Sequence, residues 1–390
     1  MSTLRRSLGG DVRQYGIVGA LIVIVLLFQV LTDGKLLLPN NVASLVGQNA
    51  YVMILAIGMV IVIIAGHIDL SVGSVVAFVG GVVALAMNQA GLPWWVAVLI
   101  GLVVGALVGA WQGFWVAYVG IPAFIVTLAG MLIFRGLAIV LIGVTLAGFP
   151  APFVQIANGY VPNELGYVLN RDVVTLTLGA VAIAALVVSQ VRARANLVRY
   201  DLQVEPRGAF IGKLVLFSAV IGGLAWVLAG STGGTPIVLL IVGFLIIVYT
   251  FLMSRTVFGR HVYAIGGNLH AAILSGIDTR KVNFWIFVNI GTLAGLAGVV
   301  TTSRGGAALA SAGGNYELDA IAACFIGGAA VTGGIGRVSG AIVGALIMGV
   351  LNMGLSIMSV DAAWQQAIKG LVLLLAVAFD LLNKRRAGGR

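Results

Sequence analysis

Long apolar runs recur along this chain of 390 residues, and short polar stretches separate them. A helix needs about 20 consecutive apolar residues to cross a bilayer. Several runs are short or interrupted by glycine, which makes two or more of them candidates for half-helices and leaves ten crossings as the alternative count. We predict twelve membrane segments, at residues 16–32, 49–66, 72–89, 94–119, 123–146, 173–191, 213–230, 236–253, 282–302, 319–334, 336–358 and 363–382.

The composition indicates a membrane protein and excludes a soluble one. Hydrophobic residues make up 61% of the chain and charged residues 9%, and the mean hydropathy is +1.13. Soluble domains carry roughly 25% charged residues, and so few charges do not cover a water-facing surface. We therefore expect an all-α polytopic helical bundle that forms one transmembrane domain over residues 1–390.

The basic residues are grouped in a way that predicts topology. Sixteen of the 22 Lys and Arg residues lie in residues 1–15, an expected loop at 192–213, residues 254–281 and the C-terminal tail. Twelve crossings place these four segments on one side, which we expect to be the cytoplasm because Lys and Arg concentrate in cytoplasmic loops. Both termini are then cytoplasmic. The loops expected outside hold only three basic residues, Lys35, Arg171 and Arg304.

Glycine accounts for 55 residues and forms one regular pattern in the segment 94–119. Four glycines at a spacing of four residues give a helix one smooth face, which suits close packing against a second helix. We predict a packing seam rather than a binding site. The four residues are Gly101, Gly105, Gly109 and Gly113.

A weak internal repeat relates residues 55–82 to residues 321–348. Each stretch has an apolar run, a break that contains glycine, and a new apolar run. Repeated broken helices are typical of a translocation pathway. The alternative interpretation is a chance similarity between glycine-rich membrane segments.

No catalytic or metal-binding constellation is present in the sequence. The single cysteine, Cys324, lies in an apolar run, and the histidines His67, His261 and His270 lack the spacing of metal ligands. The run GAFIGKL at 208–214 lacks the spacing and the Ser or Thr of a phosphate-binding loop. We expect neither an enzyme nor a nucleotide-binding protein, no cofactor and no bound metal.

Polar groups inside membrane segments are energetically unfavourable and indicate function by default. Some candidates for the substrate pathway also have a structural interpretation. Asp69 could instead cap the helix that restarts after the break, and Trp111 and Trp115 could instead pack between helices or anchor at the lipid interface. Asparagine and glutamine are uncharged hydrogen-bonding groups that suit a neutral polar solute. The candidates for the substrate pathway are Asp69, Trp111, Trp115, Asn352 and Gln365.

Four charged side chains in apolar surroundings have structural interpretations. Glu317 and Asp319 open an apolar run, and acidic residues favour helix N-termini, so capping is favoured over ligand binding. Arg135 and Lys369 are expected to pair with carboxylates or backbone carbonyls.

The polar segment 254–283 differs from the rest of the chain. It contains a predicted short helix over residues 268–275, capped by its first residue and ended by Gly276. Small residues around a short helix suit insertion into a groove on another protein. Ala271 and Ala272 are expected to be small because that groove is tight. An ordinary linker is the alternative.

Within this segment, GRHVYAIGGNLHAAILSGI at 259–277 resembles the cytoplasmic coupling loop of ribose- and xylose-type ABC sugar importer permeases. The likeness covers nearly the whole chain in order. Extra membrane segments at about 173–230 resemble the longer, xylose-type members, and His67 stands where Gly or Glu is expected. Three further stretches resemble the same family, GHIDLSVGS at 66–74, IPAFIVTLAGMLIFRG at 121–136 and ELDAIAACFIGGAAVTGGIGRVSGAIVGALIMG at 317–349.

The resemblance implies a BtuC-like type II importer permease that works as a homodimer in the bacterial inner membrane. Two cytoplasmic ATP-binding cassette subunits would grip the short helix, and a periplasmic sugar-binding protein would deliver a neutral monosaccharide, D-xylose before other sugars. No nucleic acid is involved. The implied ATPase-coupling residues are Gly259, Arg260, Tyr263, Ala264, Gly266, Gly267, Asn268, Ala271, Ala272, Ser275, Gly276 and Ile277.

Three other classes stand as alternatives. An ion-coupled secondary sugar transporter needs ion-binding or proton-relay acids at mid-membrane, and only Asp69 is a candidate. A membrane enzyme needs a nucleophile, a base or a metal set. A branched-chain amino acid permease needs paired charges for its zwitterionic substrate. The identity of the sugar and the residues that contact it do not follow from the sequence.

The grouping of basic residues predicts the accessibility of single cysteines. With Cys324 replaced, cysteines introduced at Gly9, Asn196, Gly267 and Gly388 should be protected from impermeant thiol reagents in intact cells and labelled after permeabilisation. Labelling of position 267 from outside would contradict this topology.

Overall fold

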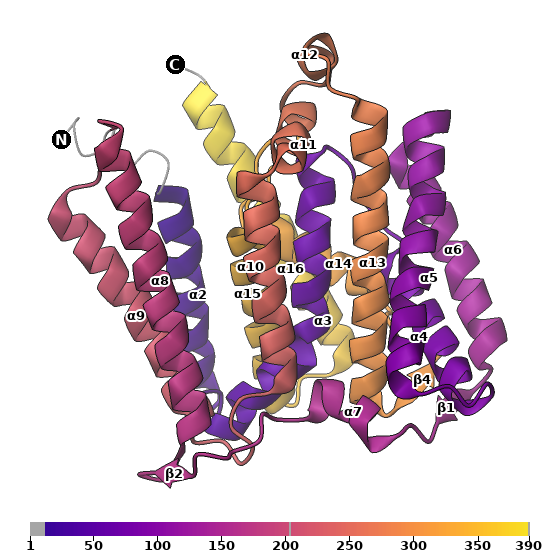
Figure 1. Cartoon of the computed structure of the whole chain (residues 1–390), viewed down its shortest axis with the longest axis horizontal. Coiled ribbons are helices and arrows are strands. Elements are labelled where there is room, and N and C mark those ends of the chain that lie inside the picture. Colours follow the sequence, from indigo (N-terminus) through magenta and orange to yellow (C-terminus); the bar gives the residue numbers. More distant parts are fainter. Residues whose placement is uncertain (1–11, 203, 389–390) are drawn as a thin grey trace.

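The computed structural model describes residues 12–202 and 204–388 and consists mainly of long, roughly aligned helices (Figure 1). Eight helices in this described part are long and apolar enough to cross a membrane, and three shorter apolar helices accompany them. The helices are α2 (Val12–Leu31), α3 (Pro39–Ile64), α4 (Val72–Asn88), α5 (Trp94–Phe114) with its π-helical continuation η1 (Trp115–Val119), α6 (Ala123–Ile142), α7 (Ala151–Asn158), α8 (Val173–Arg199), α9 (Arg207–Leu228), α10 (Ile237–Arg255), α11 (Val257–Gly267), α12 (Leu269–Leu274), α13 (Thr279–Gly305), α14 (Tyr316–Ile326), α15 (Val338–Ile357) and α16 (Ala362–Gly388).

Each of the twelve predicted segments contains a helix, but two predictions were wrong in detail. The segment 319–334 holds only α14, whose 11 residues end at Ile326. At about 1.5 Å per residue, this helix is too short to cross a bilayer core of about 30 Å. The expected basic loop 192–213 is largely helical, because α8 continues to Arg199 and α9 begins at Arg207. Arginine, alanine and leucine are good helix formers, so α8 extends beyond its apolar run.

Two pairs of short strands are the exceptions to an all-helical fold. They lie at the end of the molecule opposite α12 (Figure 1). Both pairs are antiparallel and close the connections between helices at that end. The pairs are β1 (Thr145–Ala147) with β4 (Ala307–Leu309), and β2 (Tyr167–Val168) with β3 (Arg171–Asp172).

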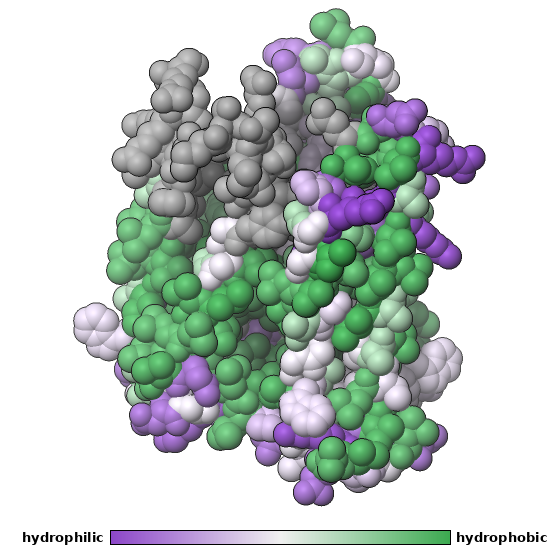
Figure 2. Space-filling view, turned by 90° about the vertical axis from the view of Figure 1, so that its left-hand side faces the viewer, coloured by the Kyte–Doolittle hydropathy of each residue, from purple (hydrophilic) through white to green (hydrophobic). Residues whose placement is uncertain are grey.

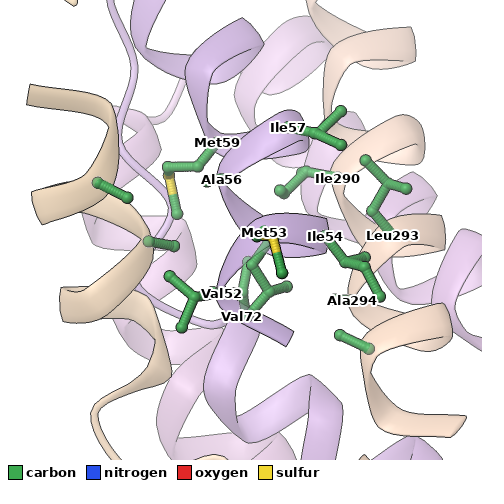
Figure 3. Close-up of a cluster of buried hydrophobic side chains, with 14 of the residues drawn as sticks. Val52, Met53, Ile54, Ala56, Ile57, Met59, Val72, Ile290, Leu293 and Ala294 are labelled. Carbon is green, nitrogen blue, oxygen red and sulfur yellow. The ribbon is translucent and has the colours of Figure 1, made fainter. Parts of the chain in front are cut away.

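Helix α3 is the buried centre of the bundle. All of its residues from 52 to 64 are buried, and it packs against α10, α13, α14 and α15. In Figure 3, Ile54 and Ile57 of α3 lie against Ile290 and Leu293 of α13. A helix that is hydrophobic on every face belongs in the interior, which explains why α3 carries no polar face over this range.

The predicted glycine face of α5 is a packing seam against α13. A β-carbon on Gly105 would collide with the carbonyl oxygen of Gly291 and lie 2.9 Å from the Cα of Gly295. On α13, a β-carbon on Gly291 would in turn lie 2.7 Å from the Cα of Gly109. The two backbones therefore touch directly, as small residues permit in membranes, and the predicted seam is confirmed.

The two stretches of the predicted internal repeat both fold as helix, break and helix. α3 and α4 flank the break at residues 65–71, and α14 and α15 flank the break at residues 327–337. The breaks meet, because the amide of Gly334 donates a hydrogen bond to the carbonyl oxygen of Ile64 (2.8 Å). The repeat therefore exists in the order of elements, although α14 is much shorter than α3.

Helices α8 and α9 form a hairpin at the edge of the bundle. They pack mainly on each other, and few of their side chains are buried. Figure 1 shows the pair beside α2. Seen from that side, hydrophobic side chains cover the middle of the molecule and hydrophilic side chains gather toward its ends (Figure 2). An apolar band between polar ends matches the cross-section of a bilayer.

The seam predicts that bulk at Gly105 destabilises the protein. Gly105→Leu should force α5 and α13 apart, and overpacking typically costs about 1–3 kcal/mol. The matched control is Gly136→Leu on α6, because no atom lies within 4 Å of a β-carbon at that position. The unfolding temperature in detergent should be lower than that of the wild type for Gly105→Leu and unchanged for Gly136→Leu. Equal unfolding temperatures would contradict the seam.

Candidate functional site

Helix α12 is a short helix at one extreme end of the molecule (Figure 1). The side chain of Asn268 accepts a hydrogen bond from the amide of Ala271 (3.0 Å), which caps the helix start. Gly276, with φ +80°, lets the chain reverse after its end. The predicted short helix is confirmed, with Asn268 as its cap and Gly276 just beyond it.

The exposed side chains of α12 are apolar. Leu274 is 88% exposed, Ile273 51% and Leu269 45%, and we call these three the α12 apolar surface. Exposed apolar groups that cluster mark protein interaction sites. This surface was not predicted, although three large apolar residues in a polar segment are a signal of it in the sequence.

Ala272 has a different role from the one predicted. Its side chain is 3% exposed and therefore packs inside its own chain. Its small size follows from this internal packing, so the explanation by a partner's tight groove was wrong for Ala272. Ala271 is exposed, as that explanation required.

The C-terminal part of α11 contacts both helix breaks. A β-carbon on Gly266 would collide with the carbonyl oxygen of Ile64 and lie 2.7 Å from the amide nitrogen of Gly334. The hydroxyl of Tyr263 donates a hydrogen bond to the carbonyl oxygen of Gly336 (2.8 Å). Burial raises the pKa of Tyr263, so this hydroxyl stays a neutral donor. These contacts join α11, the helix that leads into the exposed α12, to the two breaks.

The other predicted coupling residues shape the segment itself. Gly259 lies where a β-carbon would collide with the backbone of Met253 at the end of α10. The hydroxyl of Ser275 donates to the carbonyl oxygen of Ala271 (2.8 Å). The amide of Ile277 donates to the carbonyl oxygen of Ala272 (3.1 Å), which closes the turn. Arg260 and Gly267 are exposed, and Ala264 and Ile277 are half-buried.

Asp69 lies in the first break and is 1% exposed. Its carboxylate accepts hydrogen bonds from the amide (2.8 Å) and the hydroxyl (2.7 Å) of Ser71. The Ser71 hydroxyl in turn accepts one from the side-chain amide of Gln112 (2.7 Å). Asp69 therefore holds the turn into α4 and, through Ser71, ties α4 to α5. This geometry favours the structural interpretation of Asp69.

The two tryptophans predicted for the substrate pathway pack with other aromatic rings. Trp111 and Trp115 meet edge to face with ring centroids 6.5 Å apart. Trp111 also meets Phe134 of α6 edge to face, at 5.8 Å. This arrangement favours helix packing over stacking on a sugar.

The two predicted amides are engaged elsewhere. The side chain of Asn352 donates to the side-chain oxygen of Asn49 on α3 (3.1 Å). The side chain of Gln365 donates to the carbonyl oxygen of Val360 (2.9 Å). These contacts do not join the five pathway candidates into one cluster, so their role in transport stays a prediction. Among the described residues, no group of three or more His, Cys, Asp or Glu is arranged to hold a metal.

Three charged groups inside the bundle have polar partners, and they are Lys369, Asp319 and Arg135. Lys369 forms an ion pair with Asp319 (3.2 Å), and the hydroxyl of Tyr51 donates to the same carboxylate (2.9 Å). Glu317 and Asp319 lie in the first turn of α14, as expected, but Asp319 does not cap the helix, because its carboxylate binds side chains of α3 and α16. The predicted pairing of Lys369 is confirmed. Arg135 donates to two backbone carbonyl oxygens in residues 310–312 (2.8 and 2.7 Å), as expected.

Two adjacent glycines give a matched test of the α11 contact. Gly266→Ala should push α11 away from the breaks and lower stability by about 1–3 kcal/mol, the usual cost of overpacking. Gly267→Ala should be tolerated, because nothing lies within 4 Å of its added β-carbon. Thermal unfolding and transport activity of the two variants provide the measurement. Equal behaviour of both would contradict the contact.

Comparison with known proteins gives matches over almost the whole chain. Residues 41–377 match the family model described as branched-chain amino acid transport system / permease component. The chain is 42% identical to the xylose transport system permease protein XylH of Escherichia coli K12, over 97% of this chain and 94% of that protein. It is 40% identical to XylH of Haemophilus influenzae, over 94% and 96% of the two chains. It is 33% identical to the ribose import permease protein RbsC of Bacillus subtilis, over 95% and 94%.

No solved structure matches the chain. The family match begins in α3 and ends in α16, so it includes both helix breaks and the whole of α11 and α12. The chain therefore belongs to the family of branched-chain amino acid transport system permease components, and it is similar to permease proteins for xylose and ribose.

Proposed function

We propose that this chain is the membrane-spanning permease subunit of a binding-protein-dependent ABC importer that carries a neutral monosaccharide, D-xylose first among them. The observation that carries the proposal is the 42% identity, over nearly the whole chain, to a permease named for xylose transport. The permease itself is not an enzyme. ATP hydrolysis belongs to a separate cytoplasmic subunit.

The proposed topology places α12 and both termini in the cytoplasm. The start of α2, the end of α8, α12 and the end of α16 lie at the same end of the molecule (Figure 1). The grouped basic residues belong to these segments, and such an excess favours the cytoplasmic side. Residues 1–11 and 389–390, which hold Arg5, Arg6 and Arg390, lie outside the described residues.

Twelve passes, a BtuC-like type II architecture and a homodimer complete the proposed assembly. α14 is the shortest α-helix among the twelve predicted segments, and the glycine-rich break after it continues its path toward α11, since Gly334 lies against Gly266. In this arrangement two permease copies enclose the pathway. Two ATPase subunits dock on α12, and a periplasmic sugar-binding protein docks at the opposite end.

Coupling proceeds through α11 in this proposal. ATP-driven closure of the ATPase subunits displaces α12, and α11 passes the movement to the two breaks through Gly266 and Tyr263. Gly266 touches the backbone of the breaks with its own backbone, and Tyr263 reaches it with one hydrogen bond, so no long flexible side chain lies between α11 and the breaks. Such a packed junction has discrete arrangements, which a nucleotide-dependent contact can bias.

A neutral cargo agrees with the charges of the bundle. Lys369 is paired with Asp319, and Arg135 is bound to two backbone carbonyls. Neither of these two cations is available for the carboxylate of an amino acid. The half-buried Arg304 is unpaired within the described residues, but no acid is among the described residues that line the cavity beside it, so the amino group of a zwitterion would have no partner there, which supports a sugar over a zwitterion. The name of the family does not decide between the two, whereas the similar proteins are named for xylose and ribose.

The α12 apolar surface predicts where the ATPase binds. Leu274→Glu should place an unpaired charge in that contact, and burying such a charge at an interface costs several kcal/mol. A loss of about 3 kcal/mol weakens association more than a hundredfold. The variant should insert in the membrane normally, lose co-purifying ATPase and lose ATP-dependent D-xylose uptake.

The control is Leu202→Glu, in the connection between α8 and α9. Leu202 is 55% exposed, and the α8–α9 hairpin lies at the edge of the bundle, away from α12 (Figure 1), so this variant should keep both the ATPase and uptake. Normal transport by the Leu274→Glu variant would remove the proposed docking site. Transport by the wild-type chain alone, in liposomes without ATP, would remove the importer assignment and favour a secondary transporter.

A further inference from the structure

A cavity of about 300 Å³ lies between α3, α13, β4 and the start of α14. It is at the end of the molecule opposite α12, where Figure 1 shows β4. Small-molecule sites occupy roughly 300–1,000 Å³, so this cavity suits a small ligand. None of its lining residues was among the pathway candidates of the sequence analysis. The polar and aromatic groups that line it are Gln48, Tyr51, Thr301, Arg304 and Tyr316.

Two tyrosines form a rigid aromatic wall of the cavity. The rings of Tyr51 and Tyr316 are stacked, with centroids 3.6 Å apart and an angle of 16° between their planes. The hydroxyl of Tyr51 donates to Asp319 (2.9 Å), which is itself held by Lys369. The wall is therefore fixed by groups behind it before any ligand arrives.

Polar groups with unused hydrogen-bonding capacity face this wall. Within the described residues, the guanidinium of the half-buried Arg304 makes no hydrogen bond and no ion pair, and Tyr316 lies near it. Gly47 leaves room for the Arg304 side chain, since a β-carbon on Gly47 would lie 2.9 Å from Nη1 of Arg304. The buried Thr301 hydroxyl lies close to Tyr316 but makes no well-formed hydrogen bond.

We propose that this cavity is a binding subsite for a neutral monosaccharide within the permease itself. A sugar has an apolar C–H face, which the tyrosine wall can cover, and hydroxyls, which can accept from Arg304 and bond with Gln48 and Thr301. No acidic side chain is among the described residues that line the cavity, so it holds no counter-charge for a cation. This inference rests on the proposed function, which brings sugar to the end of the molecule opposite α12.

The subsite should bind weakly, because a transport pathway must release what it binds. Saturation-transfer NMR on the purified full-length permease in nanodiscs, without ATPase or binding protein, should show contact of D-xylose with the protein. Arg304→Gln and Tyr316→Leu should each weaken this binding by about tenfold or more, the loss expected for one anchor contact. Gln48→Leu is a third variant, at an exposed position where folding is not at risk.

The matched control is Tyr167→Leu. Tyr167 is 65% exposed at the same end of the molecule and does not line the cavity. This variant should bind D-xylose as the wild type does. The second probe is D-glucuronate, whose carboxylate would pair with Arg304 in a site for sugar acids. Binding of glucuronate without binding of D-xylose would overturn the proposal of a neutral ligand.

Uptake by the reconstituted complex separates this inference from the proposed function. The cavity variants should reduce D-xylose uptake and still retain the ATPase, because the cavity is remote from α12. The subsite alone would be overturned by three results together. The wild-type complex would import D-xylose, the isolated permease would give no saturation transfer, and the cavity variants would import normally. A wild-type complex without ATP-dependent import would instead overturn the proposed function.

Discussion

Direct contact between backbones, made possible by glycine, is the interaction on which this bundle depends. Inside lipid there is no hydrophobic force between helices, so they associate through close packing and hydrogen bonds. The seam between α5 and α13 is one example. Another joins α14 to α15, where a β-carbon on Gly327 would collide with the carbonyl oxygen of Gly340. A third joins the start of α4 to the stretch before α14, where Gly73 and Gly313 exclude each other's β-carbons.

The same contacts permit the two breaks in the helices. Unpaired backbone groups are unfavourable at membrane depth, so irregular chain is tolerated only where protein or water satisfies it. Here the breaks help to satisfy each other, through the hydrogen bond from Gly334 to Ile64. The junction also receives Gly266 from α11. One small region thus combines the least regular backbone of the bundle with the attachment of its exposed helix, and a rearrangement there changes both together.

Local signals made part of this structure predictable. The cap at Asn268, the left-handed Gly276 and the glycine face of α5 each depend on residues a few positions apart, and all three were confirmed. Partners at long range were not predictable. The bond from Tyr51 to Asp319 joins residues 268 positions apart, and Lys369 lies 50 positions from the same carboxylate. The cavity bounded by Tyr51 and Tyr316 depends on these long-range contacts, so no single stretch of the sequence predicts it.

The direction of a single side chain was also beyond the sequence. In a helix of six residues, the spacing of apolar groups is too short to show which face is covered. Ala272 is turned inward, whereas Leu274, two positions later, is turned outward. The packing of α11 and α13, which precede and follow this helix in the chain, decides the orientation, and it depends on how those helices are placed in the bundle.

The ion pair between Lys369 and Asp319 bears on how the protein is made. α16 follows α14 and α15 in the chain, so it leaves the ribosome after them, and it carries a lysine two turns from its start. An unpaired lysine at the centre of a membrane helix costs roughly 2.5–3.5 kcal/mol on insertion scales. Its counter-ion belongs to α14 and is already synthesised by then. Helix α16 therefore enters the bundle when the carboxylate that neutralises its lysine is already in place, and a chain truncated after α15 leaves this buried carboxylate without its cation.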